Sequence, residues 1–191
     1  MNEIFQVRLK NVIDMAVTFT AMNRVFEKQS KHQIVSRLGV ALGELGTVSD
    51  RVDFEKIHSA FCNWFVTQIR TAESRKNGRV TKLARAASYG HAAKVFDVAS
   101  KVYVYYCHLP NVKAAAALLP LLHGAIDTEI LKNLKSRYPE PGINAETISE
   151  IGEREYAVLQ GLVARHIGDE FKDQGIYPAQ YDDIMWYRLN R

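Results

Sequence analysis

Apolar side chains along most of the chain recur at steps of three and four residues, the spacing of one face of an α-helix. The first half contains none of the five prolines, because all of them lie at position 110 or later. Strand-like alternation is scarce, and the segment "VYVYY" (102–106) continues a helical run. The pattern therefore predicts an all-α fold. The expected helices are 3–28, 31–45, 53–73, 87–108, 112–119, 127–138, 145–173 and 178–189.

The starts of several helices are marked by side chains that can accept hydrogen bonds from free first-turn amides. The candidate N-caps are Asp50 or Asp53, Asp127 and Asn144. No repeat or low-complexity tract is present, and a turn, "YPEPG" (138–142), separates the last helices from the rest. We expect a single domain over 1–191, a bundle of about seven or eight helices around the aromatic helix 87–108, with 138–142 as the point where it could divide.

The composition limits the classes of protein to which the chain can belong. The apolar share is 47% and the charged share 24%, both ordinary for a globular protein. The longest apolar run, 114–122, contains a proline and is far shorter than a membrane span. Charges interrupt the apolar positions of the N-terminus, unlike a secretory signal. Cys62 and Cys107 lack a metal-binding or CxxC spacing, which favours buried free thiols in a reducing compartment. We expect a cytoplasmic protein without a membrane partner.

Charge is distributed unevenly along the chain. Positions 70–94 hold seven basic residues and one acid, whereas positions 140–183 hold ten acids and three bases. Clustered cations attract phosphates, so the basic segment predicts contact with DNA or RNA through a loop at Asn77-Gly78 between two helices. The candidate contact residues are Arg70, Arg75, Lys76, Arg79, Lys82 and Arg85. The alternatives are a solvated face, or pairing with the acidic C-terminal helices within the chain or across a dimer.

Helix 87–108 carries one polar stripe on an otherwise apolar surface. The members of the stripe are Gly90, Lys94, Asp97, Lys101, Tyr105 and His108. One interpretation is the polar edge of a core helix, in which Asp97 pairs with Lys94 and Lys101. The other is a stripe that lines a cleft, where burial lowers the pKa of a lysine toward nucleophilic use.

A second polar block, "HGAIDTEI" (123–130), follows a proline that ends one helix. Asp127 opens the next helix, which a capping role explains. His123 is either a packed turn residue or a polar group aimed at the same cleft as the lysines. The candidate catalytic residues are therefore Lys94, Lys101, Asp127 and His123. The other histidines form no metal-ligand spacing such as HxxxH, so we expect neither a metal nor a cofactor.

The arrangement "LPNV…AIDTEIL" (109–131) resembles the helix-hairpin-helix DNA glycosylases, in which an "LPGVG" hairpin binds the DNA backbone and a later segment carries an essential Asp. Leu109, Pro110 and Val112 match the hairpin, while Asn111 and Lys113 replace its glycines. Asp127 matches the acid of the family, at a shorter distance from the hairpin. Ala115 stands where bifunctional members carry their catalytic lysine.

A longer stretch, roughly 87–134, is similar to uncharacterised bacterial proteins of mobile elements and gene cassettes. Their pattern is a "GxAxK…K" helix followed by an "H-x-x-ID" block. The matching positions are Gly90, Ala92, Lys94, Lys101, His123, Ile126 and Asp127. This resemblance implies a helical protein of mobile-element origin and no assigned activity.

Three functional hypotheses follow. The first is a nucleic-acid-binding protein that uses the basic segment 70–94. The second is a glycosylase-like, nucleic-acid-processing enzyme in which Lys94 or Lys101 is the nucleophile and Asp127 acts as a base or stabilises positive charge. The third is a homodimeric interaction module without catalysis. Its apolar patch would lie on the N-terminal helix or on the C-terminal "IMWY" segment: Ile4, Phe5, Ile13 and Val17, or 184–187.

Overall fold

The structure is a computed structural model that describes residues 3–18, 24–77, 79–139 and 141–189. Eight α-helices occur in these ranges, with one short β-hairpin, so the predicted all-α class is confirmed. The helices are α1 (Glu3–Ile13), α2 (Ser30–Glu44), α3 (Arg51–Gln68), α4 (Tyr89–Lys101), α5 (Val112–Leu118), α6 (Thr128–Arg137), α7 (Glu153–Glu170) and α8 (Pro178–Leu189). None of the described helices has both the length and the apolar character needed to span a membrane.

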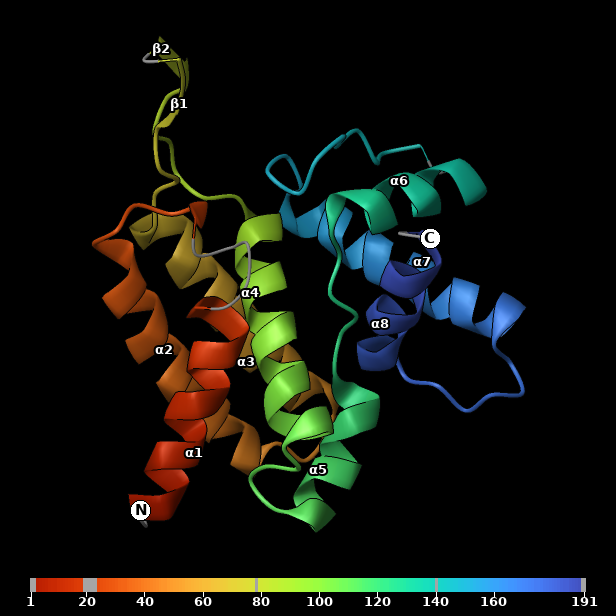
Figure 1. Ribbon diagram of the computed structural model, residues 1–191. Coiled ribbons are helices and arrows are strands. Elements are labelled where there is room, and N and C mark those ends of the chain that lie inside the picture. The colour runs from red at the N-terminus through yellow and green to blue at the C-terminus, as the bar shows by residue number, and fades with distance from the viewer. Residues whose placement is uncertain (1–2, 19–23, 78, 140, 190–191) are drawn as a thin grey trace.

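The predicted central helix does occupy the centre. α4 continues into a wider π-helical turn, Val102–Tyr106, and eleven of its thirteen residues are buried. It packs against α2 and α3 on one side and against α7 on the other. Figure 1 shows α1 and α2 to the left of α4, α3 passing behind it, and α6, α7 and α8 to its right. Helix α4 therefore lies between the two groups of helices and contacts members of both.

Several predicted helices end earlier than their patterns suggested. The first is α-helical only to Ile13 and then widens into a π-helical turn, Asp14–Thr18; the predicted positions 19–23 lie outside the described residues. Helix α3 ends at Gln68 rather than at 73, because the chain turns into extended backbone that bonds to residues 25–27 and 85–87.

The helix predicted over 145–173 begins at Glu153, and Asn144 does not cap it. The carboxylate of Glu155 accepts hydrogen bonds from the backbone amides of Asn144, Ala145 and Gly152. These amides are thereby satisfied in a loop, so the segment has no need of helical carbonyl partners. The other predicted caps are present, since Asp50 accepts from the Asp53 amide and Asp127 from the amides of Glu129 and Ile130.

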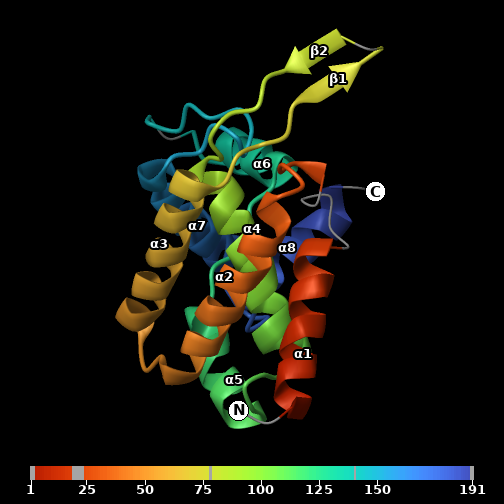
Figure 2. The same ribbon diagram turned by 90° about the vertical axis from the view of Figure 1, so that its left-hand side faces the viewer.

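A β-hairpin replaces the loop expected at Asn77-Gly78. Strand β1 (Ser74–Lys76) pairs antiparallel with β2 (Arg79–Lys82), with Lys76 opposite Arg79. Asn77 has a φ of 52°, in the left-handed region that Asn tolerates and that hairpin turns require. The hairpin projects beyond the end of the helical bundle in both views (Figures 1 and 2).

The loop before α7 lies directly on the first turn of α4. A Cβ added to Gly90 would lie 2.4 Å from the Ile148 carbonyl oxygen and 2.8 Å from the Ile151 Cβ, while the Gly90 amide donates to the Ile151 carbonyl at 3.1 Å. Only a glycine permits this approach of two backbones. Position 90 therefore joins the C-terminal half of the chain to the central helix.

We predict that Gly90→Ala destabilises the protein by about 1–3 kcal/mol, because the loop must move away from α4. The matched control is Gly43→Ala in α2, where an added Cβ has no atom within 4 Å. This control should be neutral or stabilising by up to about 1 kcal/mol, because alanine favours helix more than glycine does. Urea denaturation measures both free energies of unfolding. Equal effects of the two substitutions would contradict the close contact at position 90.

Candidate functional site

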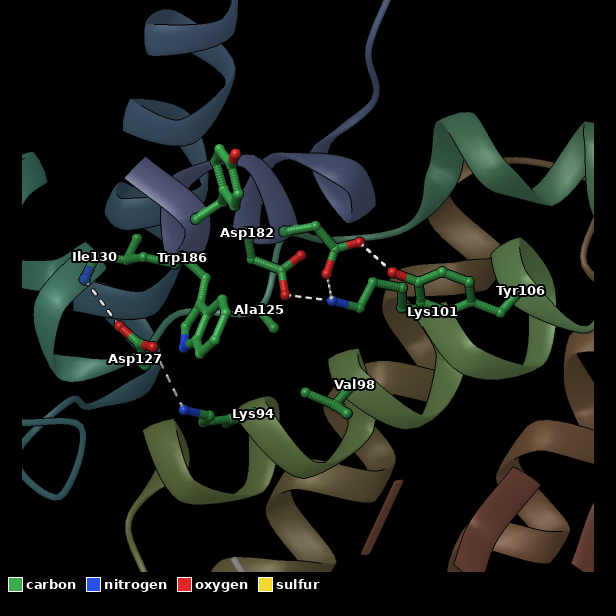
Figure 3. A pocket seen from close by; sticks show the side chains of 11 residues that line it. Lys94, Val98, Lys101, Tyr106, Ala125, Asp127, Ile130, Asp182 and Trp186 are labelled. Atoms are coloured by element: carbon green, nitrogen blue, oxygen red, sulfur yellow. Dashed lines mark hydrogen bonds and ion pairs between the residues drawn. The ribbon is translucent and has the colours of Figure 1, made fainter. Parts of the chain in front are cut away.

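A cavity of about 470 Å³ lies between α4, α8 and the segment that leads into α6. Figure 3 shows Lys94 and Lys101 entering it from α4, Asp127 from the start of α6, and Asp182 and Trp186 from α8. Two predicted catalytic lysines and the predicted acid, which are distant in sequence, thus line one pocket. We call this cavity the Lys94 pocket.

Lys94 and Asp127 form the less constrained pair of the pocket. The Lys94 Nζ lies 4.0 Å from Asp127 Oδ2, which is too far for a hydrogen bond. The other oxygen of Asp127 accepts hydrogen bonds from the amides of Glu129 and Ile130, at 3.0 and 2.9 Å. Burial lowers the pKa of Lys94, although the negative charge of Asp127 opposes this shift. The pocket therefore holds an amine close to a carboxylate of fixed orientation.

Lys101 is placed very differently. Its ammonium donates to Asp182 Oδ2 at 2.5 Å and to Asp183 Oδ1 at 2.8 Å. Burial disfavours the charge of Lys101, but the two carboxylates outweigh it and raise its pKa. Tyr106 donates to the second oxygen of Asp183. Lys101 is thus held as a charged group by two carboxylates, so Lys94 is the stronger candidate for a nucleophile.

The predicted pairing of Asp97 with Lys94 and Lys101 is wrong, although residues three and four apart lie on one broad face of α4. The Asp97 carboxylate is buried and bonds to His58 Nε2 at 3.2 Å and to the Tyr156 hydroxyl at 2.7 Å. The pairing fails because α3 and α7 supply closer partners.

His123 belongs to this second group and is not among the residues that line the Lys94 pocket. Its Nδ1 lies 3.0 Å from the Tyr156 hydroxyl, and its Nε2 lies 2.8 Å from Glu55 Oε1. The expectation that His123 points into the same cleft as the lysines is therefore wrong. We call Glu55, His58, Asp97, His123 and Tyr156 the buried polar cluster.

The basic segment is exposed at the hairpin and its base. Arg70, Arg79, Lys82 and Arg85 are exposed; Arg75 and Lys76 lie in β1, and their side chains are outside the described residues. Arg70 lies 3.8 Å from Glu27 and donates to the Ala84 carbonyl. Within the described part of the chain, no acid lies within 4.0 Å of Arg79, Lys82 or Arg85.

The acids of the C-terminal half have partners elsewhere. Glu146 pairs with Lys135, and Glu170 pairs with Arg137 and Arg188. Asp182 and Asp183 hold Lys101. In the described residues, then, these acids do not neutralise the basic segment through direct contacts.

Only part of the apolar patch that was predicted to form a dimer contact on the N-terminal helix is exposed. Ile13 and Val17 are buried in the core, while Ile4 is 68% exposed. At the other end, Trp186 and Tyr187 are exposed and line the Lys94 pocket. Of the two cysteines, Cys62 is buried, as expected, and Cys107 is only half-buried.

No protein-family model, curated protein or solved structure matches the chain.

The lowered pKa of Lys94 can be measured directly. We predict that the rate of its modification by acetic anhydride rises with pH to a midpoint below that of Lys113, an exposed lysine on α5, because more of the Lys94 amine is neutral at a given pH. Asp127→Asn should move the Lys94 midpoint lower still, because it removes the negative charge that favours the ammonium. Peptide mass spectrometry measures both midpoints. Identical midpoints for Lys94 and Lys113 would contradict the effect of burial.

Proposed function

We propose that the chain binds nucleic acid through the projecting basic hairpin. The observation that supports this most strongly is a set of exposed cations on β2 and its flank, which have no acidic partner within 4.0 Å among the described residues. Such cations are free to neutralise phosphates and to release counterions.

The position of the hairpin adds to this proposal, because it projects beyond the end of the helical bundle (Figures 1 and 2). The base of the hairpin also borders a cavity of about 340 Å³, lined in part by Lys82, Arg85, Thr71, Ser74 and Thr128.

We predict that labelled single- or double-stranded DNA binds the full chain, and that binding weakens steeply between about 50 and about 200 mM salt. Reversal of two charges, Arg79→Glu with Lys82→Glu, should lower the affinity at least about 10-fold in fluorescence anisotropy. The matched control, Lys113→Glu with Lys172→Glu, makes the same change in net charge at exposed positions outside the hairpin. Equal losses in the two double variants, or no binding at low salt, would refute a hairpin interface.

A second candidate function is catalytic, and the convergence of Lys94 and Asp127 on one pocket favours it. In this scheme the neutral Lys94 amine attacks C1′ of a nucleotide and displaces the base, which leaves with the electron pair of the glycosidic bond, and Asp127 accepts the proton that the amine loses. Lys101 has a supporting role, because it orders the carboxylates of α8 that form one wall of the pocket.

We predict that sodium borohydride traps a covalent complex between the protein and a DNA duplex that contains an abasic site. The amine adds to the sugar aldehyde with loss of water, and hydride reduces the resulting imine to a stable secondary amine. The complex should be seen by gel electrophoresis with the parent protein and with Lys113→Gln, and should be lost with Lys94→Gln. Trapping that persists in Lys94→Gln would refute Lys94 as the nucleophile, and no trapping at all would refute the catalytic candidate.

A further inference from the structure

Three metal-ligating side chains meet in the buried polar cluster, apart from both the hairpin and the Lys94 pocket. Glu55 and His58 are three residues apart on α3 and therefore share one face of that helix. His123 reaches them from the segment between α5 and α6. One ligand atom from each of these three side chains lies within 4.8 Å of the other two.

The hydrogen bonds around the Tyr156 hydroxyl determine where protons lie in the cluster. The hydroxyl has one proton and donates it to Asp97 Oδ2, at 2.7 Å. Its oxygen therefore accepts from His123 Nδ1, at 3.0 Å, so that nitrogen carries a proton. In the neutral imidazole the other nitrogen, Nε2, then has a lone pair.

That lone pair faces a second acceptor. The Nε2 of His123 lies 2.8 Å from Oε1 of Glu55. Two acceptors at this distance repel each other unless a cation lies between them, and this cation is either a proton or a metal ion.

The separation suits a metal ion. Bonds from a divalent transition-metal ion to histidine nitrogen or carboxylate oxygen are about 2.1 Å long, so two ligands at the right angles of an octahedral ion are about 3.0 Å apart, and two at the tetrahedral angle that zinc prefers are about 3.4 Å apart. The 2.8 Å between His123 and Glu55 is close to the first value. The 4.8 Å limit on the His58 atom exceeds the second by about 1.4 Å, so the His58 side chain must move toward the other two to ligate the ion.

The surroundings of these three side chains also resemble those of a metal centre. Histidine ligands usually donate their second ring N–H to a carboxylate or another fixed acceptor, which orients the ring. Asp97 bonds to His58 Nε2, which leaves the lone pair of that ring on Nδ1, 3.8 Å from the Cys62 sulfur, and Tyr156 accepts from His123 Nδ1. The Glu55 side chain is 43% exposed, which connects the group to solvent and leaves room for water as a further ligand.

From this geometry we propose that Glu55, His58 and His123 form a binding site for a divalent transition-metal ion. Two imidazoles and one carboxylate suit zinc, iron(II), cobalt(II) or nickel(II), and are poorly suited to calcium or magnesium, which prefer oxygen ligands. The sequence pattern predicted no metal, because His58 and His123 are 65 positions apart and no short motif contains both.

The test is a titration of the chelator-treated full chain with Co²⁺, followed by its visible absorption bands, and with Zn²⁺, followed by calorimetry. We expect one ion per chain and a rise in melting temperature with added Zn²⁺. Glu55→Gln keeps the size of a half-exposed side chain and should lower the affinity at least about 10-fold, as should His123→Ala. The matched control is His32→Ala, which removes an exposed histidine on α2 and should leave the affinity unchanged.

Circular dichroism shows whether a variant that binds the metal ion weakly is still folded. If His123→Ala does not fold, Glu55→Gln alone tests the proposal. Two results would overturn the proposal. One is that neither Co²⁺ nor Zn²⁺ binds the parent chain at one ion per chain. Nitrogen NMR would then show both ring nitrogens of His123 protonated at neutral pH, so that a proton lies where the metal ion was expected. The other is binding that Glu55→Gln and His32→Ala weaken equally, because the ion would then lie on the surface.

Discussion

The carboxylate of Asp97 is the group on which the arrangement of the helices depends. It lies in the middle of α4 with 1% of its surface exposed. Removing a carboxylate from water is costly unless protein groups replace its hydrogen bonds. His58 on α3 and Tyr156 on α7 supply these bonds. The interdigitated apolar side chains limit the movement of these helices, and two directed hydrogen bonds to one carboxylate further fix how α3 and α7 pack against α4.

The same network positions the Lys94 pocket. The segment between α5 and α6 is held to α7 by Tyr156, which bonds to His123, and by Gln160, whose side chain bonds to both the amide and the carbonyl of Gly124. Asp127 follows three residues later and caps α6. Because Lys94 is less than one helical turn from Asp97, one set of bonds fixes both ends of the 4.0 Å gap between Lys94 and Asp127. The same hydrogen bonds therefore fix the positions of both the Lys94 pocket and the buried polar cluster.

Helical spacing was sufficient to predict the class of fold and the central position of α4, because burial of an apolar face is a property of the local sequence. The ends of the helices were harder to predict. Helix α7 begins where Glu155 has bonded the loop amides, which depends on a turn that no spacing reveals. The hairpin was missed for another reason: its strands are short and charged, so they lack the alternating apolar positions by which strands are recognised.

In the candidate sites, too, the sequence revealed residues that are marked by their neighbours along the chain, but not the partners that tertiary packing brings to them. The stripe on α4 led to Lys94 and Lys101, and the capping position led to Asp127, since each is marked by neighbours in the sequence. The partners of these residues could not be found in this way. Asp182 and Asp183 reach Lys101 from a helix about eighty residues away, and Glu55 reaches His123 across 68 positions. Such pairs exist only after the helices have packed.

The distribution of charge follows from the same packing. Three acids of α7 and α8, Glu170, Asp182 and Asp183, are paired with bases from α4, α6 and α8 itself. Placing further cations in this bundle would remove them from water without a partner, at a cost of several kcal/mol each. On a hairpin that projects into solvent they remain hydrated, and their mutual repulsion is only about 1 kcal/mol at 4 Å. The hairpin thus keeps the exposed cations of β2 outside the bundle.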